Sequence, residues 1–111
     1  MNRKVLIIDD ETDLCLMIHR FLTKRNYEVI CAHCLKEGEQ HLYEFKPDSL
    51  LLDNNLPDGL GWDKADNFHK DFPDMHITLI SANSMTPYAG PTVIFDRIEK
   101  PISLHTIERY L

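Results

Sequence analysis

The chain has 111 residues, of which 43% are hydrophobic and 27% are charged, and these values are typical of one globular domain with its own core. Its formal net charge of −6 argues against nucleic acid as a direct partner, because phosphate binding needs clustered Lys and Arg. The apolar stretch at the N-terminus is too short for a signal peptide, and prolines interrupt the uncharged residues 77–95, so we expect a cytoplasmic protein without a membrane segment.

The first predicted element is a buried strand over residues 4–8 that ends on two carboxylates, Asp9 and Asp10. A helical pattern follows, in which apolar residues recur at intervals of three and four, at Leu14, Met17, Ile18, Phe21 and Leu22. Asp10 is expected to cap this helix, which should end near residues 24–26.

A second strand over residues 28–31 and a second helix over residues 35–45 come next. Between them, Cys31 and Cys34 have the C-x-x-C spacing of redox and zinc sites, but no second motif of this kind follows. The third cysteine, Cys15, leaves an odd number, and nothing indicates a disulfide framework. We therefore interpret the motif as structural.

The central element is the predicted strand over residues 48–53, which is continuously apolar from Leu50 to Leu52 and is followed by the turn residues Pro57 and Gly59. An apolar run of this length is typical of a strand buried on both faces of a parallel sheet. The run ends on Asp53, and the carboxyl ends of parallel strands are where open α/β sheets bind their ligands.

The C-terminal half is expected to contain a helix, two strands and a final helix, over residues 62–72, 76–80, 92–98 and 103–111. Ser81 directly follows the first of these strands and Lys100 comes two residues after the second, and Pro101 and a capping Ser103 precede the last helix. The uncharged stretch between the strands contains two prolines, so it has room for at most a single turn of a fourth helix.

Alternation of strands and helices predicts an α/β fold with a parallel sheet and helices on both faces. Right-handed crossovers make this sheet doubly wound. The expected architecture is therefore one domain over residues 1–111, with five parallel strands and a fourth helix that is short or missing.

All carboxyl ends of a parallel sheet lie on one edge, so five polar side chains should converge there: Asp9, Asp10, Asp53, Ser81 and Lys100. Clustered carboxylates repel one another, and a hard divalent cation relieves the repulsion. Oxygen ligands favour Mg²⁺, Mn²⁺ or Ca²⁺ over zinc. Because Mg²⁺ combines one or two carboxylates with phosphate oxygens, the hydroxyl and the ammonium group are suited to the rest of a phosphoryl group.

In this pattern the chain resembles the receiver domains of two-component response regulators. The resemblance rests on four motifs, each at a predicted strand end: Ile7-Ile8-Asp9-Asp10-Glu11, Leu52-Asp53 with Pro57 and Gly61, Ile80-Ser81-Ala82, and Lys100-Pro101. It implies a flavodoxin-like sheet of order 2-1-3-4-5, a cis Lys-Pro bond, and a signalling module rather than an enzyme. The implied partner is a sensor histidine kinase or a histidine phosphotransfer protein.

The resemblance also assigns roles within the site. Asp53 would accept a phosphoryl group from a phosphohistidine, and Ser81 and Lys100 would bind its oxygens. Mg²⁺ would be held by four residues: Asp9 through water, Asp10, Asp53 and the backbone carbonyl of Asn55.

One position departs from the family pattern. Three residues before Lys100 the family usually has an aromatic side chain that turns inward on phosphorylation, and here Arg97 stands in its place. A buried guanidinium needs a partner, so we expect Arg97 to face solvent. Signalling would then rely on reordering the stretch from Ser84 to Pro91.

Two alternatives stay open. A haloacid-dehalogenase-type phosphohydrolase would also use an aspartyl phosphate, but its Asp-x-Asp-x-Thr motif is only approximated by residues 9–12, Asp-Asp-Glu-Thr. A degenerate receiver would dock partners without being phosphorylated, and Arg97 is compatible with that hypothesis. Site-mapping after treatment with an acyl phosphate would distinguish Asp53 from Asp9 as the acceptor.

Overall fold

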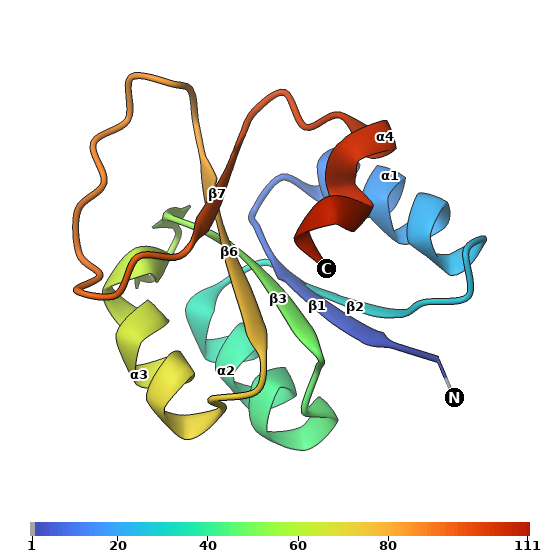
Figure 1. Ribbon diagram of the computed structural model, residues 1–111, viewed down its shortest axis with the longest axis horizontal. Helices are drawn as coiled ribbons and strands as arrows, with labels where there is room; N and C mark the ends of the chain where they lie inside the picture. The colour runs from blue at the N-terminus through green and yellow to red at the C-terminus, as the bar shows by residue number, and fades with distance from the viewer. Residues whose placement is uncertain (1) are drawn as a thin grey trace.

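The computed structural model describes residues 2–111. A five-stranded parallel sheet forms the centre of the molecule, in the order β2-β1-β3-β6-β7 (Figure 1). Its strands are β1 (Lys4–Ile8), β2 (Glu28–Ala32), β3 (Ser49–Asp53), β6 (His76–Ser81) and β7 (Asp96–Glu99). Since β6 and β7 are the fourth and fifth strands along the chain, the predicted 2-1-3-4-5 order and doubly wound fold are confirmed.

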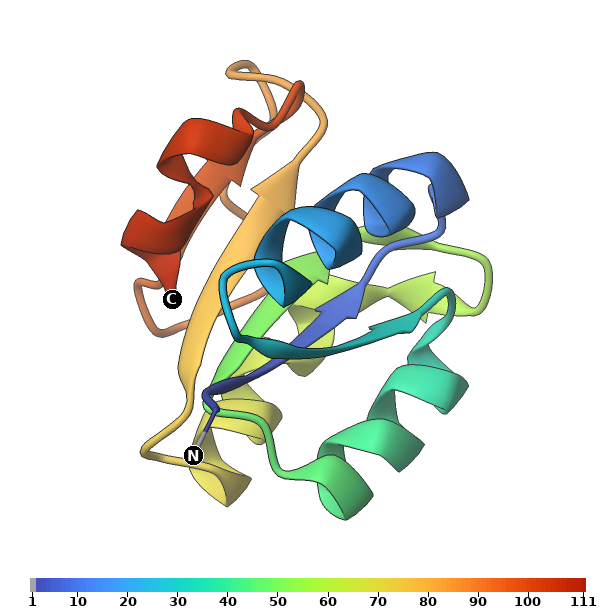
Figure 2. The ribbon, with the colours of Figure 1, turned by 90° about the vertical axis from the view of Figure 1, so that its right-hand side faces the viewer.

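Helices cover both faces of the sheet. The helices α1 (Thr12–Thr23) and α4 (Leu104–Ile107) lie on one face, and α2 (Leu35–Phe45) and α3 (Ala65–Asp71) lie on the other (Figure 2). Alternate residues of β1 serve the two sides: Val5 and Ile7 pack with α1, whereas Leu6 and Ile8 pack with α2 and α3. This two-sided burial explains why the strands are continuously apolar.

Several element boundaries differ from the sequence predictions. The third helix begins as a 3₁₀ turn, η1 (Gly61–Lys64), and the last helix ends in a second one, η2 (Glu108–Tyr110). A two-stranded hairpin of β4 (Asn55–Leu56) and β5 (Gly59–Leu60) follows β3 and was not predicted. The fifth strand is shorter than expected.

The predicted cap of the first helix is wrong. Glu11, not Asp10, occupies the capping position of α1, and no side chain caps it. The Asp9 carboxylate instead accepts a hydrogen bond from the Glu11 backbone N–H at 2.8 Å. Ser103 occupies the capping position of α4, also without a side-chain hydrogen bond.

Residues 82–95 connect β6 to β7 without a helix, which confirms that the fourth helix of the expected pattern is missing. We call these residues the β6–β7 loop; it arches over one end of β6 and returns past α3 (Figure 1). The Asp66 carboxylate of α3 fixes the returning segment, because it accepts hydrogen bonds from the Thr92 N–H at 2.8 Å and the Val93 N–H at 3.2 Å. The loop is therefore irregular but anchored.

Arg97 is half-buried, so the prediction that it faces solvent is wrong. Its guanidinium donates hydrogen bonds to the backbone carbonyls of Asn83 at 3.2 Å and Thr86 at 2.5 Å, both in the β6–β7 loop. It also lies over the Trp62 ring, 5.6 Å from the ring centre. Carbonyl oxygens and an aromatic face satisfy the charge here, and no carboxylate of the described residues pairs with it.

Two further findings bear on the predictions. The Lys100–Pro101 peptide bond is cis, as the resemblance implied. Within residues 2–111, no helix is both long enough and apolar enough to cross a membrane.

Candidate functional site

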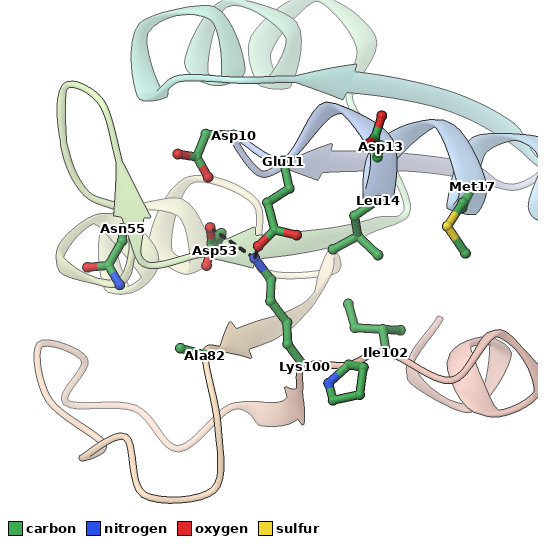
Figure 3. A pocket seen from close by; sticks show the side chains of 11 residues that line it. Asp10, Glu11, Asp13, Leu14, Met17, Asp53, Asn55, Ala82, Lys100 and Ile102 are labelled. Atoms are coloured by element: carbon green, nitrogen blue, oxygen red, sulfur yellow. Dashed lines mark hydrogen bonds and ion pairs between the residues drawn. The ribbon is translucent and has the colours of Figure 1, made fainter.

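Lys100 lies among three carboxylates at the carboxyl edge of the sheet, and Figure 3 shows two of them, Glu11 and Asp53. Its Nζ is 3.1 Å from Asp9 Oδ2, 2.8 Å from Glu11 Oε1 and 3.6 Å from Asp53 Oδ2. Asp9 is fully buried and Asp53 is 5% exposed. Among residues 2–111, the site therefore combines buried carboxylates with one ammonium group.

Strand register brings these residues together from distant parts of the chain. Ile8 of β1 pairs with Leu52 of β3. Asp9 and Asp53 are the next residues of the two strands, so they lie side by side at the carboxyl edge. On the other side of β3, β6 ends at Ser81, whose carbonyl accepts a hydrogen bond from the Lys100 N–H at 3.0 Å. This backbone contact fixes where the Lys100 side chain starts.

The remaining predicted site residues lie around this centre. Asp9, Asp10 and Asp53 each offer a carboxylate oxygen, and these oxygens lie within 4.8 Å of one another. Asp10 and Asn55 are exposed at the rim of a pocket of about 670 Å³ that Asp53 and Lys100 also line. Figure 3 shows Asp10, Asn55 and Lys100 arranged around Asp53. Three convergent carboxylates are a suitable oxygen donor set for Mg²⁺.

The Ser81 side chain is placed beside the site but makes no hydrogen bond to the other described residues. The side chain is 1% exposed, and its hydroxyl oxygen is one of two buried side-chain atoms, with Asp9 Oδ2, that lack a hydrogen-bond partner among the described residues. Asp9 Oδ2 still lies near Lys100 as an ion pair, so Ser81 is the group without any partner. A buried polar group of this kind usually has a ligand or water to bind.

Two supporting residues were not recognised as part of the site from sequence. Glu11 makes the shortest ion pair of Lys100. The only sequence signal for this role is that Glu11 directly follows Asp9 and Asp10. Trp62, fully buried, donates from Nε1 to the Leu52 carbonyl at 3.2 Å and from its backbone N–H to the Asn54 side chain at 3.1 Å. It therefore holds the chain on both sides of Asp53.

The electrostatics of the site follow from burial and from the charges within it. Burial and the Asp9 charge raise the pKa of Asp53 to about 6, although Lys100 opposes this increase. Burial also raises the pKa of Asp9. For Lys100, burial alone would lower the pKa, but hydrogen bonds to Glu11 and Asp9 and the charge of Asp53 raise it overall. At neutral pH the site holds Asp53 mostly ionised and Lys100 charged.

The raised pKa of Asp53 predicts a pH-dependent stability in the absence of metal. The folded state binds the proton of Asp53 more tightly than the unfolded state. The contribution of Asp53 to the free energy of unfolding is therefore largest at low pH, and it is lost as pH rises to about 6. Between pH 5 and pH 7 in chelator, we expect the free energy of unfolding of the unmodified chain to fall by about 1 kcal/mol more than that of the Asp53→Asn variant. Urea denaturation of both proteins at the two pH values measures this; equal pH dependence would contradict the assigned pKa.

Comparisons with known proteins identify relatives of the chain. A sequence model described as "Response regulator receiver domain" matches residues 5–111. A response regulator receiver domain protein (CheY-like) from Methanospirillum hungatei JF-1 is 23% identical, with a TM-score of 0.85 over 98% of this chain and 90% of its own.

Two further solved structures have the same fold. Chemotaxis protein CheY4 from Vibrio cholerae is 21% identical, with a TM-score of 0.80 and complete coverage of both chains. A two-component response regulator from Clostridium difficile is 22% identical, with a TM-score of 0.83 over 97% of this chain and 91% of its own.

Proposed function

Because the chain belongs to the response regulator receiver domain family of two-component systems, we propose that residues 1–111 form one phosphoacceptor domain in which Asp53 takes the phosphoryl group. The donor is a phosphohistidine of a sensor histidine kinase or of a histidine phosphotransfer protein. The observation that supports this most is the position of Asp53: a nearly buried carboxylate beside Asp9, Asp10 and Lys100, at the mouth of an open pocket. Self-phosphorylation and its reversal are the chemistry that this acidic site performs.

The carboxylates are suited to hold Mg²⁺. Asp10 and Asp53 would bind it directly, Asp9 would act through water, and the Asn55 backbone carbonyl would be a further ligand. When bound, the ion offsets the negative charge that a phosphoryl group brings to the site. The unfavourable burial that raises the pKa of Asp53 supports this assignment, because it shows a carboxylate without sufficient compensating charge.

In the transfer step, an ionised Asp53 oxygen attacks phosphorus in line with the departing imidazole nitrogen. The new O–P bond forms as the N–P bond breaks, and the electron pair stays with the imidazole. Lys100, 3.6 Å from Asp53 Oδ2, binds one phosphoryl oxygen, and the unpartnered Ser81 hydroxyl donates to another. Transfer from acetyl phosphate, with Asp53→Asn as the variant, tests this assignment.

Mg²⁺ is expected to stabilise the folded chain. Only the folded state brings the three carboxylates together, so an ion at a hundredfold excess over its Kd adds about 2.7 kcal/mol to the free energy of unfolding. Thermal melting in chelator and in millimolar Mg²⁺ measures the gain. Asp10→Asn should reduce it, whereas Asp74→Asn, which changes an exposed acid far from the site, should preserve it. An unchanged melting temperature in the unmodified chain would contradict the metal site.

We propose that the β6–β7 loop relays the signal. Ser81, the hydroxyl that would meet the phosphoryl group, directly precedes this loop, and Arg97 holds the loop through the carbonyls of Asn83 and Thr86. Movement of Ser81 toward a phosphoryl oxygen would pull on the same segment. In this proposal, the hydrogen bonds from Arg97 to the loop carbonyls change on phosphorylation. Arg97 thus takes the role that an aromatic switch residue has in the family pattern.

Backbone amide NMR tests this relay. Addition of beryllofluoride with Mg²⁺, a mimic of the phosphoryl group, is expected to shift amides throughout residues 82–98. Arg97→Ala should leave the shifts of the metal site intact but reduce those of the loop, because the tether is gone. Shifts confined to the metal site in the unmodified chain would exclude the loop as the relay.

A further inference from the structure

Two thiols from different elements lie together on the α1 face of the sheet. The Cys31 thiol, on β2, donates to the backbone carbonyl of Cys15 on α1 at 3.6 Å. The Cys15 thiol in turn donates to the Asp9 carbonyl at 3.4 Å. Both side chains belong to the same apolar cluster, which packs α1 against the sheet. Cys31 is therefore a direct neighbour of Cys15.

This arrangement differs from the pairing that the C-x-x-C spacing suggests. Cys31 points to the face covered by α1, because its neighbour in the strand, Ile30, packs with the cluster on the opposite face. Cys34 precedes α2, the helix that covers this opposite face. The sheet thus separates Cys31 from the helix that Cys34 begins, and Cys15 is its spatial partner instead.

One of the two paired thiols, that of Cys31, is accessible from a surface pocket. A surface pocket of about 270 Å³ is lined by both cysteines and by four other residues, Thr12, Leu16, His19 and His33. Cys31 is partly exposed, whereas Cys15 is only 2% exposed. A small reagent that enters the pocket therefore reaches the Cys31 sulfur first, with the Cys15 sulfur buried behind it.

We propose that Cys31 and Cys15 form a dithiol site that reacts with hydroperoxides. The Cys31 thiolate attacks the terminal peroxide oxygen, which breaks the O–O bond, releases an alcohol or water, and leaves a sulfenic acid on Cys31. The Cys15 thiol then attacks that sulfur, and a disulfide forms as water leaves. In sum, the two thiols lose two electrons to one hydroperoxide.

The local environment favours these roles. A hydrogen bond from the Cys15 side chain to the ionised Cys31 sulfur lowers the pKa of the Cys31 thiol, although burial opposes this decrease. A larger thiolate fraction makes Cys31 the faster nucleophile, since the thiolate is the reactive form. Cys15 acts as the resolving thiol because it already lies against Cys31. Neither step needs Mg²⁺ or a phosphoryl group, so the site can be tested apart from the proposed function.

Peptide mapping under non-reducing conditions tests the proposal. The reduced, metal-free chain is treated with hydrogen peroxide, alkylated and digested. We expect loss of two free thiols per chain and a cross-link between the peptides of Cys15 and Cys31. Cys34→Ser is the matched control and should give the same cross-link. A disulfide between Cys31 and Cys34, or oxidation of Cys34 with Cys15 and Cys31 intact, would overturn the proposal.

A second variant separates the two roles. Cys15→Ser removes the resolving thiol but retains a hydroxyl of similar size, and circular dichroism checks that the variant folds. With dimedone present, its Cys31 should carry the sulfenic acid adduct, which the unmodified chain forms only in small amounts. Cys31→Ser, a change at a half-buried position, should lose both the cross-link and the adduct. An adduct on Cys15 rather than Cys31 would contradict the assigned order.

Discussion

Asp53→Asn is expected to abolish phosphoryl transfer from acetyl phosphate. The amide has nearly the shape of the carboxylate but lacks the anionic oxygen that attacks phosphorus, so no acyl phosphate can form at this position. The variant should nevertheless fold, and in chelator at pH 7 it should be more stable than the unmodified chain by about 1–3 kcal/mol, because it removes a buried charge whose pKa is raised to about 6. Radiolabelling and urea denaturation measure the two effects.

Asp58→Asn is the matched control for this loss. Asp58 lies on the same connection after β3, but its carboxylate accepts hydrogen bonds from the Leu35 and Lys36 N–H groups at the start of α2, at 2.7 and 2.9 Å. Its removal should leave labelling intact. Persistent label in Asp53→Asn, with no new acceptor mapped, would contradict the role of Asp53.

Gly61→Ala is expected to damage both stability and phosphoryl transfer. A Cβ at Gly61 would overlap the carbonyl oxygen of Asp53 and would lie 3.0 Å from Leu52 Cδ1. Backbone cannot move aside as a side-chain end can, so we expect a loss of about 1–3 kcal/mol in the free energy of unfolding. Because the clash is with Asp53 itself, a displacement of the acceptor by about 1 Å should also slow transfer by about 10²-fold.

Gly38→Ala in α2 is the control for crowding that meets a side chain rather than the backbone of the acceptor. Its Cβ would meet the Ile8 side chain at 2.5 Å rather than a backbone atom. Alanine also gains about 0.5–1 kcal/mol over glycine within a helix, which offsets part of the crowding. This variant should retain its transfer rate. Equal rates in Gly61→Ala and the unmodified chain would show that Asp53 tolerates displacement of its own backbone.

The parts of the fold that sequence predicted well are those governed by periodic burial. The bounds of β1 and α2 match the prediction because an apolar run between polar residues, or an apolar stripe with a closing proline, is a local pattern. The convergence of Asp9, Asp53 and Lys100 also followed from sequence, since in a parallel sheet all carboxyl ends share one edge.

The errors concern side chains whose partners are distant in sequence. Arg97 was expected to face solvent because the sequence indicated no carboxylate partner for it. In the structure, two backbone carbonyls of the β6–β7 loop and the Trp62 ring contact its guanidinium instead. The Cys31–Cys34 motif was interpreted as structural, but the sequence did not indicate that strand alternation turns Cys31 toward Cys15. Such contacts depend on which face a residue occupies and on loop geometry, and neither is a periodic property of the sequence.

The most direct measurement of the proposed chemistry is to locate the phosphoryl group. The full chain is incubated with acetyl phosphate and Mg²⁺ and then reduced with borohydride, which converts an aspartyl phosphate to homoserine that mass spectrometry can map. We expect homoserine at position 53 alone, and none when Mg²⁺ is chelated. Homoserine at position 9, as a haloacid-dehalogenase-type enzyme would give, or at no position, would contradict Asp53 as the phosphoacceptor.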